Sequence, residues 1–171
     1  MPWVLATVLL VAASQFSASD VWVNMRFFVG RWEGTSTGEA GNGTVSRTYQ
    51  FVLNNKFIEV RNKSTYSPQE RNPKGEVHED WGMFSYDSAR KKFVFRQFHG
   101  EGFVNQYVMQ SQSNQEIIFA SEAIENLSRT YHARETYRIV NADEFVERFE
   151  IAEPGRDFEV YSETKFRRIK R

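Results

Sequence analysis

Alternation between apolar and polar side chains constrains this chain more than any other feature of its sequence. From Arg31 onward the two kinds of residue exchange places along short segments, and turn-forming residues recur at intervals of roughly 8–15 residues. In one such segment Phe145 and Phe149 share a face, while Arg148 lies on the other. Successive side chains of a strand point to opposite faces, so the pattern predicts strands with one buried face and one wet face.

The pattern divides the chain into about ten predicted strands. They cover residues 31–38, 43–53, 56–65, 76–86, 91–98, 102–111, 115–121, 129–140, 144–151 and 157–168. Most of the intervening turns are short enough for antiparallel hairpins, and no interior helix is indicated. A sheet of consecutive hairpins has unpaired backbone groups along its two edge strands, where other chains can add, unless the sheet closes into a barrel. We therefore predict an all-β fold, a roughly ten-stranded antiparallel up-and-down β-barrel.

A short helix is expected to close one end of this barrel. Residues 20–29 carry apolar side chains at helix-compatible spacing, and Asp20 is a suitable N-cap. At 171 residues the chain fits one domain once a leader is removed. We therefore assign residues 20–171 to a single barrel domain.

The first 19 residues read as a signal peptide. An apolar run over residues 2–13 is followed by small polar residues, as in a secretory leader with its cleavage zone. The run is shorter than the roughly 20 apolar residues that span a bilayer, so no stable membrane span is expected. The predicted location is therefore outside the cytoplasm, periplasmic or secreted.

Charge and composition exclude several classes of function. Lys and Arg number 22, as do Asp and Glu, so no overall field attracts the protein to nucleic acid. The chain has no cysteine, which excludes disulfides, thiolate catalysis and zinc–sulfur sites. Nucleophile elbows, phosphate loops and dinucleotide fingerprints are also missing from the sequence. Nothing in the sequence indicates an oligomeric state.

Two short motifs carry a resemblance to a known superfamily. Gly30-Arg31-Trp32 opens the first predicted strand, and Phe166-Arg167-Arg168 ends the last. This pairing resembles the calycin superfamily, which includes the lipocalins, the fatty-acid-binding proteins and the nitrobindin-like haem barrels. The resemblance implies a first-strand Trp that points inward near the closed end, with an Arg of the last strand over its ring. Arg168 shares the parity of Phe166, which makes it the expected partner of Trp32.

Two further stretches, residues 82–95 and residues 134–137, look like those of uncharacterised exported lipocalin-like bacterial proteins. Nitrobindin-like barrels bind haem through a histidine near the C-terminal strand, whereas residues 161–164 contain none. Tyr161 is an alternative haem ligand in chemical terms, but its parity opposite to Val160 predicts an outward ring. We expect no cofactor, with haem binding as the disfavoured alternative.

The chain has three histidines, His78, His99 and His132, and none of them pair at helical ligand spacing. His78 and Asp80 lie on a predicted strand whose simplest interpretation is a solvated edge. We therefore expect no metal site.

The segment 129–140 offers two alternatives for the lining of the barrel. If its even positions point inward, His132 and Arg134 place positive groups in the interior, suited to an anionic head group. If its odd positions point inward, Glu135 is a buried carboxyl between two tyrosines, and the even positions form an exposed charge ladder. The odd positions carry more apolar residues than the even positions, which favours the odd positions as the ones that point inward. Tyr107 and Phe95 on neighbouring segments are candidates for an aromatic pocket.

These features lead to one expected function and its alternatives. We expect non-catalytic binding of a small, largely hydrophobic molecule inside the barrel, because aromatic residues are abundant and catalytic motifs are missing. The alternatives are an enzyme (an isomerase, lyase or hydrolase) that uses His132, Glu135 or Tyr107 as acid or base, and a haem-binding barrel. A surface interaction module with a packed interior is the remaining hypothesis.

Overall fold

The computed structural model describes residues 20–127 and 131–170, and over these ranges the chain forms ten strands and one short 3₁₀ turn. The predicted signal peptide, residues 1–19, lies outside the described residues. In chain order the elements are η1 (Met25–Phe28), β1 (Gly30–Gly38), β2 (Gly41–Val52), β3 (Phe57–Tyr66), β4 (Glu76–Asp87), β5 (Lys92–His99), β6 (Val104–Gln112), β7 (Glu116–Glu125), β8 (His132–Asn141), β9 (Glu144–Ala152) and β10 (Glu159–Arg168).

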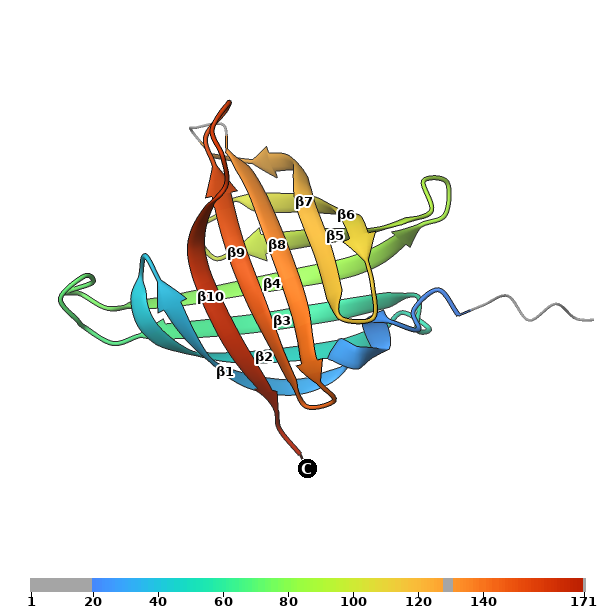
Figure 1. The fold of residues 1–171 in the computed structure, drawn as a ribbon, viewed down its shortest axis with the longest axis horizontal. Coiled ribbons are helices and arrows are strands. Elements are labelled where there is room, and N and C mark those ends of the chain that lie inside the picture. The colour runs from blue at the N-terminus through green and yellow to red at the C-terminus, as the bar shows by residue number, and fades with distance from the viewer. Residues whose placement is uncertain (1–19, 128–130, 171) are drawn as a thin grey trace, which may run out of the picture.

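The ten strands form a closed barrel in which each strand pairs antiparallel with the next, and β10 pairs with β1. Figure 1 shows β8, β9 and β10 crossing in front of β2, β3 and β4 at a steep angle, as expected for a barrel with strongly tilted strands. This confirms the predicted all-β antiparallel barrel. Closure gives each strand in the sheet two neighbours, so the barrel has no open edge.

The predicted N-terminal helix over residues 20–29 is wrong, because this segment forms turns and the four-residue 3₁₀ turn η1. Its buried residues Trp22, Met25 and Phe28 are spaced by three, which matches the three residues per turn of a 3₁₀ helix. Asp20 does cap a turn, since its carboxylate accepts a hydrogen bond from the backbone N–H of Trp22. The chain then enters β1 at Gly30, which leaves no room for further helical turns.

Trp32 and Arg168 hold the end of the barrel beside η1. The Trp32 side chain is 1% exposed, and the Arg168 guanidinium carbon lies 4.1 Å from the centre of its ring. Arg168 also donates hydrogen bonds to the carbonyl oxygens of Val29 and Phe27, at 2.8 and 2.5 Å. Gly30 begins β1 with φ of +135°, a backbone conformation that favours glycine, and a Cβ there would also come within 2.9 Å of that guanidinium. The sequence expectation of a Trp32–Arg168 contact thus has a direct counterpart in the structure.

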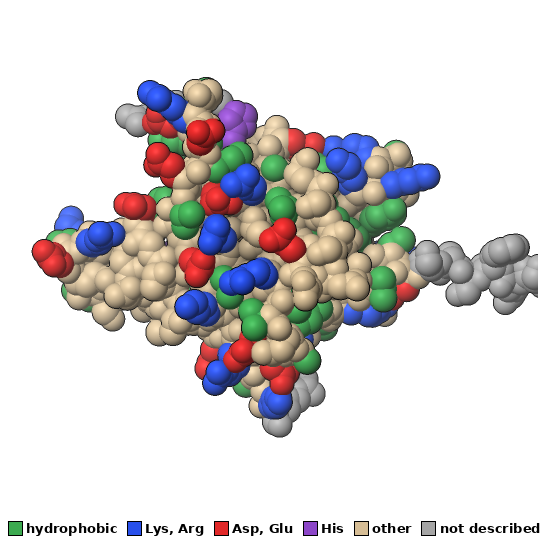
Figure 2. Space-filling view, in the orientation of Figure 1, with side chains coloured by type: hydrophobic (Ala, Val, Ile, Leu, Met, Phe, Trp, Pro, Cys, Tyr) green, Lys and Arg blue, Asp and Glu red, His purple; other side chains and the backbone are tan. Residues whose placement is uncertain are grey.

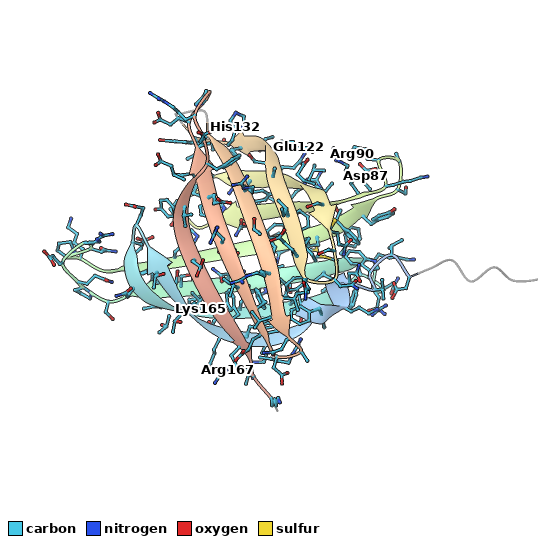
Figure 3. All side chains as sticks on the ribbon, viewed as in Figure 1. Asp87, Arg90, Glu122, His132, Lys165 and Arg167 are labelled. Carbon is cyan, nitrogen blue, oxygen red and sulfur yellow. The ribbon has the colours of Figure 1, made fainter. Side chains whose placement is uncertain are left out.

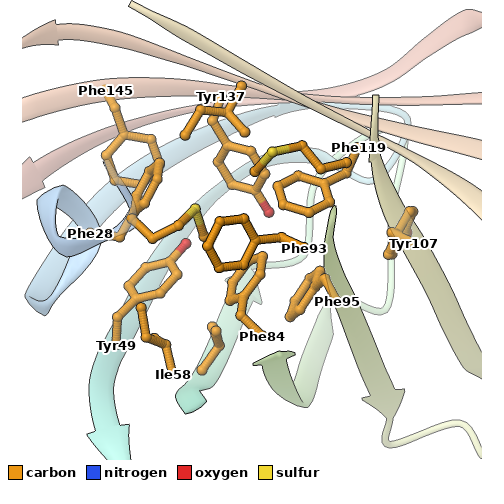
Figure 4. Packing of buried hydrophobic residues seen from close by; sticks show 14 of the residues in the cluster. Phe28, Tyr49, Ile58, Phe84, Phe93, Phe95, Tyr107, Phe119, Tyr137 and Phe145 are labelled. Carbon is orange, nitrogen blue, oxygen red and sulfur yellow. The ribbon is translucent and has the colours of Figure 1, made fainter. Parts of the chain in front are cut away.

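An aromatic core fills this closed end of the barrel, as Figure 4 shows. Phe84 stacks on Phe95 with 4.1 Å between ring centres, and Phe145 stacks on Phe166 at 4.7 Å. Rings packed at such distances leave no space for a ligand. The abundant phenylalanines therefore serve mainly to plug one half of the barrel.

The strand β10 contains a bulge that reverses the parity of its first residues. Register shifts between Val160 and Ser162, so Val160 is 51% exposed, although it shares the parity of the buried Phe166. An extra residue in one strand moves the side chains before it to the opposite face. Tyr161 accordingly lines the barrel mouth, rather than pointing outward as its parity with respect to Val160 predicted.

The outer surface carries both charge signs side by side. On the face formed by β8, β9 and β10, Figure 2 shows basic and acidic side chains interspersed without a single-sign patch. The residues described by the structure include no helix that is long and apolar enough to cross a membrane.

We predict that Arg168→Ala lowers the free energy of unfolding by about 2–4 kcal/mol, because it removes the contact over Trp32 and two charged hydrogen bonds to backbone carbonyls. Urea denaturation at pH 7 measures this loss. The control is Arg167→Ala, which removes an exposed ion pair with Glu144 and should cost less than about 1 kcal/mol. Equal losses in the two variants would contradict the structural role of Arg168.

Candidate functional site

The barrel interior contains a cavity of about 480 Å³ at the end opposite Trp32. It is lined by the last residues of β1, β3, β5, β7 and β9 and by the first residues of β4, β6, β8 and β10. Because these strand ends all lie at one rim of an up-and-down barrel, the cavity opens at that rim. Side chains fill the barrel beneath it and leave this half hollow.

The cavity has two walls of different character. On the side of β2 to β6 most of its lining residues are polar: Arg47, Asn62, Ser64, Glu76, His78, Asp80, Gln97, His99 and Asn105, with the aromatic Tyr66, Phe103 and Tyr107 among them. On the side of β7 to β9, together with Tyr161 of β10, most of its lining residues are apolar or aromatic: Ile124, Tyr131, Ala133, Phe149, Ile151 and Tyr161. Each set of residues comes from strands that are neighbours in the barrel, so the two sets lie on opposite sides of the hollow.

An ion pair that crosses the barrel forms part of the cavity floor. Arg47 on β2 donates a hydrogen bond to Glu147 on β9 at 2.5 Å, and both side chains are buried. Arg47 also donates to Asn62 at 2.8 Å. Burial on its own lowers the pKa of Arg47, but the acidic groups around it, Glu147 foremost, together outweigh burial and raise that pKa well above the usual value. The guanidinium therefore stays charged inside the barrel.

Glu135 lies in the same floor and is 3% exposed. The hydroxyl of Tyr137, two residues along β8, donates a hydrogen bond to its carboxylate. Burial, reinforced by the negative charge of Glu147, raises the pKa of Glu135 to about 8. The carboxyl is therefore protonated at neutral pH, which makes it a proton donor that faces the cavity.

Asp80 organises the polar wall. One of its carboxylate oxygens accepts a hydrogen bond from Gln97 at 2.9 Å, and the other accepts one from Asn62 at 2.8 Å. Asn62 links this group to Arg47, so the wall and the floor form one hydrogen-bonded network. A connected network holds its members in fixed positions.

Two histidines continue this network to the rim. His99 Nδ1 lies 3.2 Å from His78 Nε2, and His78 Nδ1 lies 2.7 Å from a carboxylate oxygen of Glu101. Burial lowers the pKa of His99 to about 4. On its other side, His99 Nε2 lies 3.2 Å from the side-chain nitrogen of Asn105. His78, Asp80 and His99 are also close enough together to hold a metal ion.

The residues that the sequence suggested for a site divide between the inside and the outside of the barrel. Glu135 and Tyr107 face the cavity, so the odd positions of β8 are the inward ones. Phe95 is buried in the aromatic core below the cavity. His132 lies exposed at the start of β8, at the rim in Figure 3. Arg134 pairs with Glu150 on the outer face, with hydrogen bonds of 2.7 and 2.8 Å, as in the exposed charge ladder considered above.

Sequence reasoning missed the buried Arg47 and Glu147, and it placed Asp80 on a solvated edge, whereas Asp80 is buried in the interior. A signal was present, because Arg47 has the parity of the apolar Val45 and Tyr49 on the same strand. Glu147 likewise has the parity of Phe145. A charged residue on the apolar face of a strand indicates a partner inside the barrel.

A second hollow, of about 750 Å³, lies on the outside of the barrel over β1. Its rim carries exposed charged side chains such as Lys63 and Lys165, which point to solvent. The interior cavity, by contrast, is lined by a connected network of buried polar groups, and it is therefore the candidate site.

The comparisons with known proteins bear on the fold. No protein-family model and no curated protein matches the chain. Among solved structures, the crystal structure of Rv2717c from M. tuberculosis aligns with a TM-score of 0.66 and 13% identity, over 89% of this chain and 99% of that one. The chain shares its barrel fold. A de novo designed fluorescence-activating β-barrel aligns with a TM-score of 0.42 and 19% identity, over 84% of this chain and 95% of the design. Membership of the calycin superfamily stays a prediction.

We predict that Glu135 makes the protein less stable as the pH rises from about 4.5 to about 8. Over this range the carboxyl ionises in the unfolded chain and stays protonated in the barrel, so its contribution falls by up to about 1.4 kcal/mol per pH unit. Urea denaturation at pH 6.5, 7.2 and 8 measures the slope, because below about pH 6.5 the lowered pKa of His99 changes the stability in the opposite direction. Glu135→Gln should flatten it, whereas Glu116→Gln on the exposed end of β7 should leave it unchanged. A wild-type slope in the Glu135 variant would contradict the raised pKa.

Proposed function

We propose that the protein binds a small organic molecule in the cavity at the open end of its barrel. The observation that carries this proposal is a hollow of about 480 Å³ whose polar wall faces an apolar one. This volume lies within the usual range for small-molecule sites, which combine apolar surface with a few fixed polar groups. The barrel fold is compatible with such a role.

The chemistry of the walls indicates a ligand of mixed character. Phe149 and Ile151 offer apolar surface for a ring or short chain, and the opposite wall offers the carboxylate and amides around Asp80. Such a site suits a molecule with one apolar face and one edge that forms hydrogen bonds. The largely hydrophobic ligand expected from the phenylalanine content is less well supported, because most of those rings lie in the packed core.

The balance of charge favours a ligand that donates hydrogen bonds. Besides the protonated Glu135, the carboxyl groups of Glu76, Asp80, Glu101 and Glu147 line the cavity with a single guanidinium, that of Arg47. A carboxylic acid would meet repulsion from this set, whereas an amine, amide or hydroxyl would find acceptors. Arg134, which the sequence offered as an anchor for an anionic head group, lies outside the barrel.

A second candidate function is acid–base catalysis on the same ligand. The pKa of Glu135, raised to about 8, is the observation that favours it, because a group that titrates near neutrality can donate a proton and recover it. Tyr107 lies in the same wall as Asn105 and accepts a hydrogen bond from it at 2.8 Å. If catalysis occurs, Glu135→Gln abolishes conversion of the ligand while binding persists.

We predict that Ala133→Trp abolishes ligand binding, because the indole would occupy the hollow beside the apolar wall. The purified protein is incubated with a small-molecule cell extract and separated by gel filtration, and bound compounds are identified by mass spectrometry. Wild-type protein and the control Ala123→Trp, on the exposed face of β7, should enrich the same compound by at least about tenfold over Ala133→Trp. Equal recovery from all three proteins would contradict binding in the cavity.

A further inference from the structure

The fold brings two histidines and an aspartate together at the mouth of the cavity. His78 and Asp80 are two residues apart on β4 and therefore point to the same side of the sheet. In the neighbouring strand β5, His99 pairs directly opposite Asp80. Since all three line the cavity, the pairing of β4 with β5 gathers three metal-binding side chains at one point of the interior.

The geometry points to a binding site for one divalent transition-metal ion, which we propose is held by His78, Asp80 and His99. His78 Nε2 lies 3.2 Å from His99 Nδ1 and 3.6 Å from a carboxylate oxygen of Asp80, and the three ligand atoms lie within 4.8 Å of one another. Ligand atoms about 2.0–2.1 Å from a tetrahedral zinc ion are about 3.3 Å apart. The two separations at His78 Nε2 are therefore within a few tenths of an ångström of those that a common ion requires.

Groups behind the three ligands orient them as metal sites require. His78 turns Nε2 toward the other ligands, while its Nδ1 lies 2.7 Å from the Glu101 carboxylate, which accepts the ring N–H. A carboxylate behind a ligating histidine fixes its tautomer and increases its basicity. The Asp80 oxygen nearest His78 also accepts a hydrogen bond from Asn62 at 2.8 Å, so the carboxylate is held in place as well.

Asn105 supplies an independent observation. It is 3% exposed, and its side-chain oxygen is the one buried side-chain polar atom of the described residues that has no hydrogen-bond partner. Its side-chain nitrogen lies 3.2 Å from His99 Nε2. When His99 binds a metal through Nδ1, its Nε2 carries the proton and needs an acceptor. Turning the Asn105 amide over places the unpartnered oxygen opposite that N–H, and also within reach of the Tyr107 hydroxyl.

The set of ligands selects the class of metal ion. Two imidazoles and one carboxylate suit Zn²⁺ and other first-row divalent ions, whereas Mg²⁺ and Ca²⁺ prefer oxygen ligands. Three protein ligands leave a fourth position, which faces the cavity and is open to water or a bound molecule. The site therefore adds a Lewis acid to the cavity, whichever organic molecule occupies it.

Titration of the purified, chelator-treated protein with Zn²⁺ in a calorimeter tests this inference. We expect one equivalent to bind with a dissociation constant of about 1 μM or lower, and His99→Gln to weaken binding by at least about 100-fold. His132→Gln is the matched control, because His132 is the remaining histidine of the chain and lies exposed on β8. This variant should bind Zn²⁺ as the wild type does. Circular dichroism confirms that each variant is folded.

Three outcomes would overturn the inference. The first is that wild-type protein takes up no Zn²⁺ at about 100 μM. The second is that His99→Gln binds as tightly as wild type, which would place the ion between Glu76, His78 and Glu101, the more exposed group at the rim. The third is that His132→Gln loses binding. None of these depends on the organic ligand, so the metal site and the proposed function fail or succeed separately.

Discussion

The pairing of β1 with β10 is the constraint on which the rest of the structure depends. It turns an open meander into a cylinder, so that every second side chain points to a common interior. Trp32 and Arg168 are opposite each other in this pairing, and their contact holds the closed end together with η1. Without closure, inward-facing charges such as Arg47 and Glu147 would not meet across the barrel.

The interior is divided into an apolar half and a polar half, and this division gives the barrel its chemical character. The aromatic core stabilises the closed end by burying surface, while the open end contains charged groups whose burial is costly unless they are paired. A protein that needed stability alone would be served as well by apolar residues in place of the Arg47–Glu147 pair. The polar interior beside the hollow is what the proposed binding of a small molecule requires.

The barrel itself could be predicted from the sequence, because alternation and turn residues are local signals. The 3₁₀ turn η1 could not be predicted, because the apolar spacing of residues 20–29 also fits a helix, and only the packing of Trp22, Met25 and Phe28 onto the barrel end distinguishes the two. The bulge before Ser162 reversed a parity argument for the same reason: register depends on the partner strand.

The site was harder to predict, because its residues are brought together by pairing rather than by sequence spacing. His99 is 19 positions from Asp80 in the chain and directly opposite it in the sheet. Glu135 could be placed inside from the apolar residues of its strand, but its raised pKa depends on the depth of its burial and on Glu147 from the next strand. Sequence alone supplied the candidates on β8, and the structure decided which of them face inward.

A crystal structure of the protein tests the central claim most directly, namely that the open half of the barrel is a preformed polar binding cavity. We predict a hollow between Asp80 and Phe149, lined by polar residues on one side and mostly apolar residues on the other, with ordered density for water, an ion or a small molecule inside it. If Phe149, Tyr161 and their neighbours instead fold inward and fill that space with side chains, the account is contradicted.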